Sequence, residues 1–328
     1  FGYAGTTLRV DLSRRTIIKQ SLDESLTTRF LGGVCLASKI LYNEVASRID
    51  PLDPRNILIF STGPLNATCV PLASKVSVVT KSPLTSTLLA CTMGGDFASE
   101  LKYAGYDALL IQGRSDRQVY LWVNNGQVEI KDANDLKGLT LSSTEQTIKK
   151  DLGCRDVKIA AIGPAGENLV KFANITHSLY RHAGRGGAGA VMGSKNLKAI
   201  AIRGTRSIEV ADFENLLKAT EEILEPIAEG TISSAKTYTD YGTPSLVDPM
   251  NEIGIFPVRN FQSGVFQGVE RINGGSLKRT MWVGNKACFG CPIACGKSTA
   301  VMDGDHKGTF LVGPEYETIY ALGSNCGI

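Results

Sequence analysis

Three cysteines lie within eight residues, Cys288, Cys291 and Cys295, in a C-x2-C-x3-C array. Thiolates at this spacing can converge from one tight loop onto a soft metal centre. An iron–sulfur cubane and a structural zinc ion both take four ligands, so a fourth must come from elsewhere, and His306 and Cys326 are candidates. The array favours an iron–sulfur cluster over zinc, and free thiols are the third interpretation. Radical enzymes that use S-adenosylmethionine have the reverse spacing and are set aside.

A second candidate is the glycine-rich segment 181–193, which contains five glycines together with Arg181 and Arg185. Glycines allow backbone N–H groups to approach a ligand closely, and arginine binds phosphate through two parallel hydrogen bonds. The spacing Gly184-x-Gly186-x-x-Gly189 matches a dinucleotide fingerprint, but no apolar strand precedes it and no long helix follows. The segment therefore predicts a loop that holds a phosphate-bearing ligand, and a glycine-rich packing turn is the alternative.

Weaker signals surround these two segments. Gly94 and Gly95 stand at a probable helix start, where anions can bind. Glu315 and Glu317 are two residues apart, which by itself is typical of a solvated surface. Among the three histidines only His182, inside the Arg/Gly segment, rises above a structural interpretation.

Many short β-branched or apolar runs in the first 205 residues predict strands. The expected strands are 7–12, 56–60, 74–79, 108–111, 118–123, 127–130, 157–162 and 199–202, and the expected helices are 23–46, 95–104 and 142–151. The Asn124-Asn125-Gly126 stretch predicts a hairpin turn. Because helices do not join the strands regularly, we expect an α+β fold and not a strict βαβ sheet. We expect no internal repeat.

The spacing of apolar residues changes from strand-like to helical near residue 210. Apolar residues recur at helical spacing from Phe213 to Leu224, strand signals become sparse, and 316–323 reads as a helix. We expect a β-rich N-terminal cofactor-binding domain over 1–208, followed by the start of a mainly helical domain over 209–328. The second part resembles half of a domain.

Composition excludes several classes of protein. The chain has 328 residues, a net charge of +3, 43% hydrophobic residues and 20% charged residues, which is ordinary globular composition. Basic residues are scattered, so nucleic acid is not expected as a partner, and no apolar run is long enough for a membrane span. Eight cysteines in a chain of this length, three of them clustered, indicate a reducing compartment, and we expect a cytoplasmic protein.

Several segments together resemble the aldehyde:ferredoxin oxidoreductase family. They are 100–107, 162–168, 183–198, the cysteine array and 313–317, and they occur in the family's order. The resemblance implies an N-terminal β-rich base for the cofactor, followed by two mainly helical domains.

The family resemblance also implies the cofactors: tungsten (or molybdenum) held by two pterins, a [4Fe–4S] cluster and Mg²⁺ that bridges the pterin phosphates. It places Lys75, Thr92, Gly94 and Gly95 on one side of the pterin site, and Arg181, His182, Ala183, Gly184, Arg185, Gly186 and Gly187 on the other. Relatives often have Arg at position 75, and some have Asn at position 92. Lys75 keeps the charge but loses the two-pronged hydrogen bonding of Arg.

The implied reaction is the oxidation of an aldehyde to a carboxylic acid, with the electrons passed through the cluster to ferredoxin in an anaerobic metabolism. Glu317 is the first choice for the proton-accepting carboxylate and Glu315 the second. The family's fourth cluster cysteine lies further downstream, so Cys326 is not expected to be a ligand. We therefore expect the chain to be an incomplete part of an enzyme that forms a homodimer or larger complex. The alternatives are a low-potential reductase subunit of the aryl-CoA reductase type, and a non-catalytic cofactor or electron-transfer subunit.

Overall fold

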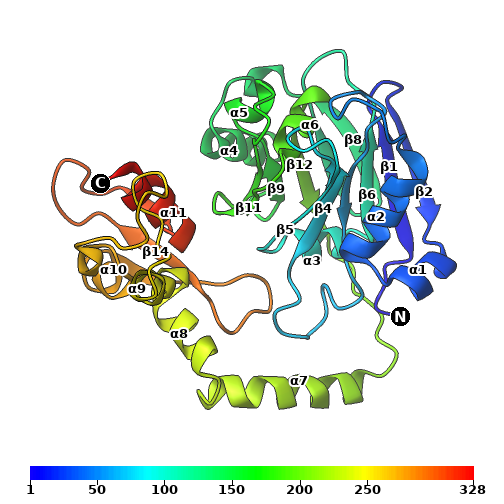
Figure 1. Cartoon of the computed structure of the whole chain (residues 1–328). Coiled ribbons are helices and arrows are strands. Elements are labelled where there is room, and N and C mark those ends of the chain that lie inside the picture. The colour runs from blue at the N-terminus through cyan, green and yellow to red at the C-terminus, as the bar shows by residue number, and fades with distance from the viewer. The chain divides into compact units, whose positions relative to one another are not determined.

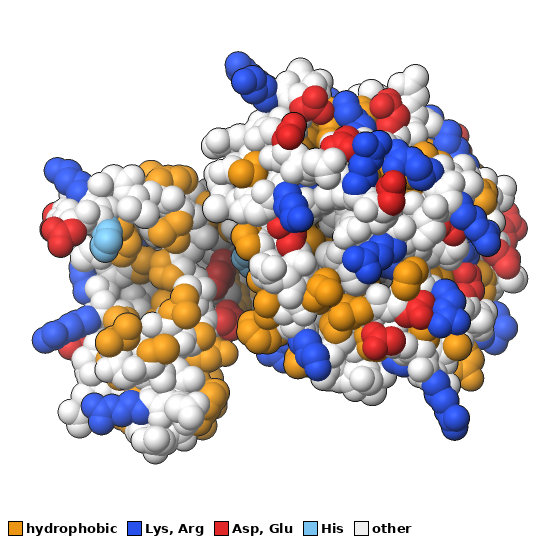
Figure 2. Space-filling model, turned by 90° about the horizontal axis from the view of Figure 1, so that it is seen from above, with side chains coloured by type: hydrophobic (Ala, Val, Ile, Leu, Met, Phe, Trp, Pro, Cys, Tyr) orange, Lys and Arg blue, Asp and Glu red, His pale blue; other side chains and the backbone are white.

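The computed structural model describes all 328 residues. The chain divides into two compact units, 1–216 and 217–328, and the division falls within helix α7 (Phe213–Ala228) (Figure 1). No helix combines the length and the apolar character needed to cross a bilayer. The face in Figure 2 carries Lys and Arg side chains interspersed with Asp and Glu side chains over the larger unit.

The first unit contains two six-stranded mixed sheets. The first sheet has the strand order β2-β1-β6-β3-β4-β5. Its strands are β1 (Thr6–Asp11), β2 (Thr16–Ser21), β3 (Leu58–Ser61), β4 (Val76–Lys81), β5 (Leu88–Met93) and β6 (Ala108–Gln112). Only β1 and β6 pair in parallel, and the other neighbours are antiparallel.

The second sheet has the order β11-β10-β9-β12-β7-β8. Its strands are β7 (Val119–Asn124), β8 (Gln127–Asp132), β9 (Lys158–Ala161), β10 (Ile175–His177), β11 (Arg181–Ala183) and β12 (Leu197–Arg203). Here too a single pair, β12 and β7, is parallel. The hairpin between β7 and β8 closes at Asn124 opposite Gln127, with Asn125 at φ +51°, which confirms the predicted turn.

The two sheets have the same topology. Strands β1 to β6 of the first sheet correspond to β7 to β12 of the second, in the same spatial order when the second sheet is read from its opposite edge. The single parallel pair of the first sheet, β1 and β6, corresponds to the single parallel pair of the second, β7 and β12. The expectation of no internal repeat is therefore wrong at the level of topology. The duplication escapes sequence reading because equivalent strands share a hydrophobic pattern but little residue identity.

One continuous apolar core lies between the two sheets. It includes Leu8 and Phe60 from the first sheet, and Leu121 and Ile200 from the second. The buried helices α3 (Phe97–Tyr103) and α6 (Ala188–Ser194) contribute to the same core. Burial of these apolar side chains holds the two sheets together.

Other helices cover the outer faces of the sheets. Helix α2 (Gly33–Glu44) packs on the first sheet and α4 (Leu141–Leu152) on the second, while the short α5 (Pro164–Glu167) packs beside α6. The helix expected over 23–46 is interrupted at Leu31, whose φ of +55° ends α1 (Glu24–Phe30).

The second unit contains short helices and one small sheet. Its helices are α8 (Ser233–Tyr241), α9 (Val247–Glu252), α10 (Gly274–Thr280) and α11 (Tyr316–Leu322). The sheet is antiparallel, with β14 (Gly296–Ala300) between β13 (Trp282–Lys286) and β15 (Phe310–Val312). The expected α+β fold is confirmed, although these three strands lie in a stretch where the pattern had indicated few.

In the first unit the fully buried Lys195 binds backbone carbonyl groups of the segment before β3. The Lys195 Nζ donates to the carbonyl oxygens of Asn56 at 2.6 Å and Pro54 at 3.3 Å, and the side chain has no exposed surface. Burial lowers the pKa of Lys195 to about 7, and the charges of Asp53 and Asp11 oppose only part of that shift.

This shift predicts a pH dependence of stability. The unfolded lysine has a pKa of about 10.4, so between pH 7 and 10 the unfolded chain binds a proton that the folded chain has lost. We therefore expect the unfolding free energy to increase as pH rises above 7, by at most about 1.4 kcal/mol per pH unit from this group. Lys195→Met should remove that increase. Urea unfolding followed by Trp122 fluorescence in a Trp282→Phe background measures it at pH 7, 8 and 9. Parallel pH profiles for the two proteins would contradict the prediction.

Candidate functional site

The two loops predicted to hold a ligand occupy equivalent positions in the duplicated sheets. The first follows edge strand β5 and leads into α3, and the second follows edge strand β11 and leads into α6. The two edges meet, since the Ser82 hydroxyl donates to the Gly186 carbonyl at 2.7 Å and a Cβ on Gly186 would strike the Leu89 side chain. At this hydrogen bond the fold joins residues that are 104 positions apart in the sequence.

The predicted residues differ in exposure along this edge. Lys75, Thr92, His182, Gly184 and Arg185 are exposed; Gly94, Arg181 and Gly186 are half-buried; Gly95, Ala183 and Gly187 are buried. Lys75 directly precedes Val76, which pairs with Met93, so Lys75 lies beside the first loop. A Cβ on Gly95 would lie 3.6 Å from the Arg181 Cγ, so the first loop also touches β11.

Packing explains several glycines of the second loop. Gly187 has φ +84°, and a Cβ there would collide with the Lys171 carbonyl oxygen. A Cβ on Gly189 would collide with the Asn174 carbonyl oxygen. At these positions the glycine-rich packing turn, the alternative interpretation, accounts for the residue type. Gly184 differs, because its Cβ direction meets only the His182 Cβ at 3.7 Å, and it stays exposed beside Arg185.

Neighbouring side chains contact both His182 and Arg181. The His182 Nδ1 lies 3.0 Å from the Thr176 hydroxyl, and the Arg181 guanidinium stands 4.9 Å from the centre of the Tyr180 ring. Partial desolvation of the ring, and then the charge of Arg181, lower the pKa of His182. His182 is therefore a neutral hydrogen-bonding group at neutral pH.

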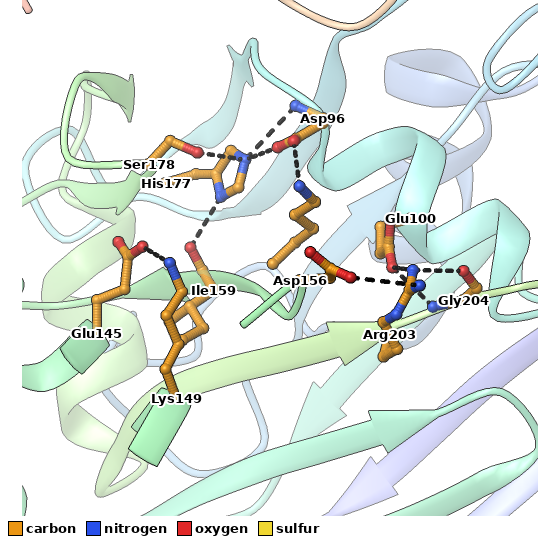
Figure 3. Close-up of polar contacts among 11 residues, drawn as sticks. Asp96, Glu100, Glu145, Lys149, Asp156, Ile159, His177, Ser178, Arg203 and Gly204 are labelled. Atoms are coloured by element: carbon orange, nitrogen blue, oxygen red, sulfur yellow. Dashed lines mark hydrogen bonds and ion pairs between the residues drawn. The ribbon is translucent and has the colours of Figure 1, made fainter. Parts of the chain in front are cut away.

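Beneath the first loop lies an ion-pair network that sequence reasoning missed. The Asp96 carboxylate contacts the His177 Nε2 at 2.5 Å and the Lys158 Nζ at 2.7 Å (Figure 3). Burial alone would raise the pKa of Asp96, but the hydrogen bonds and charges of His177 and Lys158 outweigh it and leave the pKa lowered. The only sequence signal was an Asp directly after the Gly94-Gly95 pair, because its partners are 62 and 81 residues away.

In the second unit the three clustered cysteines lie on the single loop between β13 and β14. All three are half-buried and none forms a disulfide, and the Cys291 N–H donates to the Cys288 carbonyl at 3.2 Å. No three His, Cys, Asp or Glu side chains are arranged as a metal-binding group in this structure. The loop is anchored by Thr239, whose hydroxyl donates to the Ile293 carbonyl at 2.9 Å.

Lys297 also anchors this loop from the adjoining strand β14. Its buried Nζ donates to the Ala294 carbonyl of the loop at 3.4 Å, and to the Thr239 carbonyl at 2.7 Å and the Asn285 Oδ1 at 2.8 Å. Burial lowers the pKa of Lys297, and the nearby Cys295, Asp240 and Glu315 act in the opposite direction.

The two candidate carboxylates flank the start of α11 but have different surroundings. Glu315 is half-buried and accepts a hydrogen bond from the Thr243 hydroxyl at 2.5 Å, and that hydroxyl in turn accepts one from the Tyr316 N–H at 2.9 Å. Glu317, in the first turn of the helix, is exposed. Glu315 is therefore fixed in place, whereas Glu317 faces solvent in this structure.

The side chains at the two predicted sites are of the types that would bind a phosphate group and an iron–sulfur cluster. Exposed Lys75 and Arg185, together with open Gly184, form a cationic edge that fits a phosphate-bearing ligand. The nearby Asp96 carboxylate is already bound by Lys158 and His177. Three thiols on one loop match the soft ligands of an iron–sulfur cluster in type, and they would supply three of its four ligands.

Two family models together match most of the chain. Residues 7–204 match the family described as aldehyde ferredoxin oxidoreductase, N-terminal domain, and residues 218–328 match aldehyde ferredoxin oxidoreductase, domains 2 & 3. A tungsten-containing aldehyde ferredoxin oxidoreductase of Pyrococcus horikoshii is 43% identical over 100% of this chain and 53% of its own length. An aliphatic sulfonate oxidoreductase, WOR-like subunit, of Pyrococcus furiosus is 32% identical over 100% of this chain and 54% of its own length.

A solved structure has a similar fold. It is the active site complex BamBC of benzoyl coenzyme A reductase in complex with 1,5-dienoyl-CoA, with a TM-score of 0.86 and 30% identity over 99% of this chain and 51% of that chain. The chain thus spans about half the length of the relatives that it matches.

Proposed function

This chain belongs to the aldehyde ferredoxin oxidoreductase family, and from that premise we propose that it forms part of a tungsten-pterin enzyme that oxidises aldehydes to carboxylic acids. The observation that carries the proposal is the meeting of edge strands β5 and β11, each followed by one of the two predicted cofactor loops. Two equivalent loops at one edge suit a cofactor with two equivalent pterin halves.

In this proposal the chain's own residues bind and orient the cofactor. Arg181, Arg185 and Lys75 neutralise the pterin phosphates, and the Gly184 backbone allows close approach. A bound Mg²⁺ would neutralise further negative charge of those phosphates. The bound tungsten centre supplies the two-electron redox chemistry. Glu317, or Glu315 in second place, accepts a proton from the reacting aldehyde and water.

The second unit carries electrons onward in the same proposal. Cys288, Cys291 and Cys295 would hold three irons of a [4Fe–4S] cluster, and that cluster would supply one-electron transfer toward ferredoxin in the cytoplasm. The loop between β13 and β14 is held by Thr239 and Lys297, which suits a site that must keep three ligands in a fixed arrangement.

The test is anaerobic purification of the whole natural protein from cells grown with tungstate. We expect tungsten, pterin, iron and sulfide to co-purify, and we expect simple aldehydes to reduce ferredoxin. A protein loaded with tungsten and pterin that oxidises no aldehyde would refute the assigned reaction.

A reductase is the second candidate, because the benzoyl coenzyme A reductase complex has the same fold at a TM-score of 0.86. Its identity of 30% is lower than the 43% to the aldehyde enzyme, which favours aldehyde oxidation. Reduction of an aryl-CoA by the loaded protein, without aldehyde oxidation, would favour the reductase. Absence of both activities in a loaded protein would favour a cofactor or electron-transfer subunit.

The shape of the Arg185 guanidinium leads to a prediction about how much pterin the protein retains. Arg185→Lys keeps the charge but loses the planar fork that binds phosphate through two hydrogen bonds. We expect the variant to retain less pterin per protein, by roughly tenfold if one charge-assisted hydrogen bond worth about 1.5 kcal/mol is lost. Fluorescence of the oxidised pterin released on denaturation measures this. Arg206→Lys, at an arginine outside the predicted site, is the control, and equal pterin content in all three proteins would count against the role of Arg185.

A further inference from the structure

The ring of His177 is fixed at both nitrogens. It is 1% exposed, its Nδ1 lies 2.8 Å from the Ile159 carbonyl oxygen, and its Nε2 lies 2.5 Å from the Asp96 Oδ1 (Figure 3). The Ser178 hydroxyl, at 3.0 Å, and the Asp96 N–H, at 3.5 Å, lie further from Nε2.

These contacts fix the orientation of the ring. A carbonyl oxygen only accepts hydrogen bonds, so Nδ1 donates to the Ile159 carbonyl. On the opposite side of the ring, Nε2 faces the Asp96 carboxylate, which also contacts Lys158. The imidazole is therefore held at both nitrogens.

The network of Asp96, His177 and Lys158 ties the two sheets together at the cofactor edge. Asp96 follows β5 of the first sheet, whereas His177 in β10 and Lys158 in β9 belong to the second. One carboxylate is thus held by two side chains from the opposite sheet.

The same ring packs directly against predicted cofactor residues. Gly95 has φ +97°, and a Cβ there would lie 2.6 Å from the His177 Cδ2 and 3.6 Å from the Arg181 Cγ. On another side, the Phe97 ring meets the His177 ring edge-on at 5.6 Å between centroids. Displacement of the imidazole would therefore move the Gly94-Gly95 turn and Arg181 together.

We propose that His177, with Asp96 and Lys158, is a positioning residue that holds the Gly94-Gly95 turn and Arg181 in one arrangement for a phosphate-bearing pterin. The inference rests on the proposed function. Loss of one partner removes a contact that fixes Asp96, which directly follows the turn, so the turn is held less firmly.

Two measurements on the whole anaerobically purified protein test the role. In Asp96→Asn and His177→Gln we expect pterin content to fall about tenfold, as is typical when an outer-shell partner is lost. In the pterin-free proteins we expect faster hydrogen–deuterium exchange over residues 93–97 than in the wild type. Lys158→Gln removes one cation at a partly exposed position, so it should fold even if the other variants do not, and it should show a smaller loss.

A matched control comes from a second ion pair in Figure 3, that of Glu100 with Arg203. Glu100, on α3, accepts from Arg203 at 2.9 Å and from the Gly204 N–H at 2.8 Å. Glu100→Gln should lower stability but keep pterin content, because these two partners belong to the end of β12 and not to the predicted pterin loops.

The outcomes separate the positioning role from the proposed function. Equal pterin loss in Glu100→Gln and Asp96→Asn would overturn the positioning role, as would unchanged pterin in both Asp96→Asn and Lys158→Gln. A wild-type protein without pterin would refute the proposed function instead, while the exchange of residues 93–97 would still report on the network.

Discussion

Glu317→Gln should lower kcat for aldehyde oxidation by about 100-fold or more, because positioned proton transfer contributes that much to catalysis. An amide has nearly the shape of the carboxylate but cannot accept the proton. Tungsten, pterin and iron content should stay unchanged, since Glu317 is exposed and belongs to none of the predicted ligand sets. Steady-state kinetics together with metal analysis measure both effects.

Glu315→Gln separates the two carboxylates. Glu315 already accepts the Thr243 hydroxyl hydrogen bond, and the hydroxyl can reverse its direction to face an amide. We therefore expect a much smaller fall in kcat than for Glu317→Gln. Glu270→Gln, at another exposed glutamate, controls for loss of surface charge. If Glu315→Gln lost the activity and Glu317→Gln kept it, the two roles would be exchanged.

Replacement of a single clustered cysteine should remove the iron–sulfur cluster. Cys291→Ala leaves two thiolates on the loop between β13 and β14, and a cubane needs four ligands in total. We expect most of the iron and sulfide to be lost and the EPR signal of the reduced protein to disappear. Electron transfer to ferredoxin should fall accordingly, while pterin content should be retained, since the predicted pterin ligands lie in the first unit.

Two other cysteines make this test specific. Cys326 is exposed, and its thiol lies 3.3 Å from the Ala321 carbonyl oxygen; Cys35 is exposed on α2. Cys326→Ala and Cys35→Ala should keep full iron and sulfide. Loss of the cluster in Cys326→Ala would identify that residue as the fourth ligand, and stoichiometric zinc without sulfide in the wild type would overturn the iron–sulfur assignment.

Local patterns predicted most of the individual elements. The Asn-Gly turn, the apolar runs of β6 and β7 and the helical spacing in α4 and α7 all appear where expected, because each depends on residues close in sequence. Strands β2, β5, β10 and β11 of the first unit were missed. The first two are edge strands of their sheet, and most of their residues are not buried. The other two have three residues each, too few for a periodic pattern, and pair with neighbouring strands.

For the candidate site, the sequence by itself determined the ligand types: three thiols at C-x2-C-x3-C spacing, and arginines among glycines. Only the tertiary structure decided which of these residues serve packing and which remain open to a ligand. It assigned Gly187 and Gly189 to backbone packing, left Gly184 open, and joined Asp96 to His177 across 81 residues. Residue types and short spacings can be read directly from the sequence. Close packing of backbone segments and ion pairing between distant residues depend on which sheet edges meet. That meeting is set by burial of the apolar core between two sheets of the same topology.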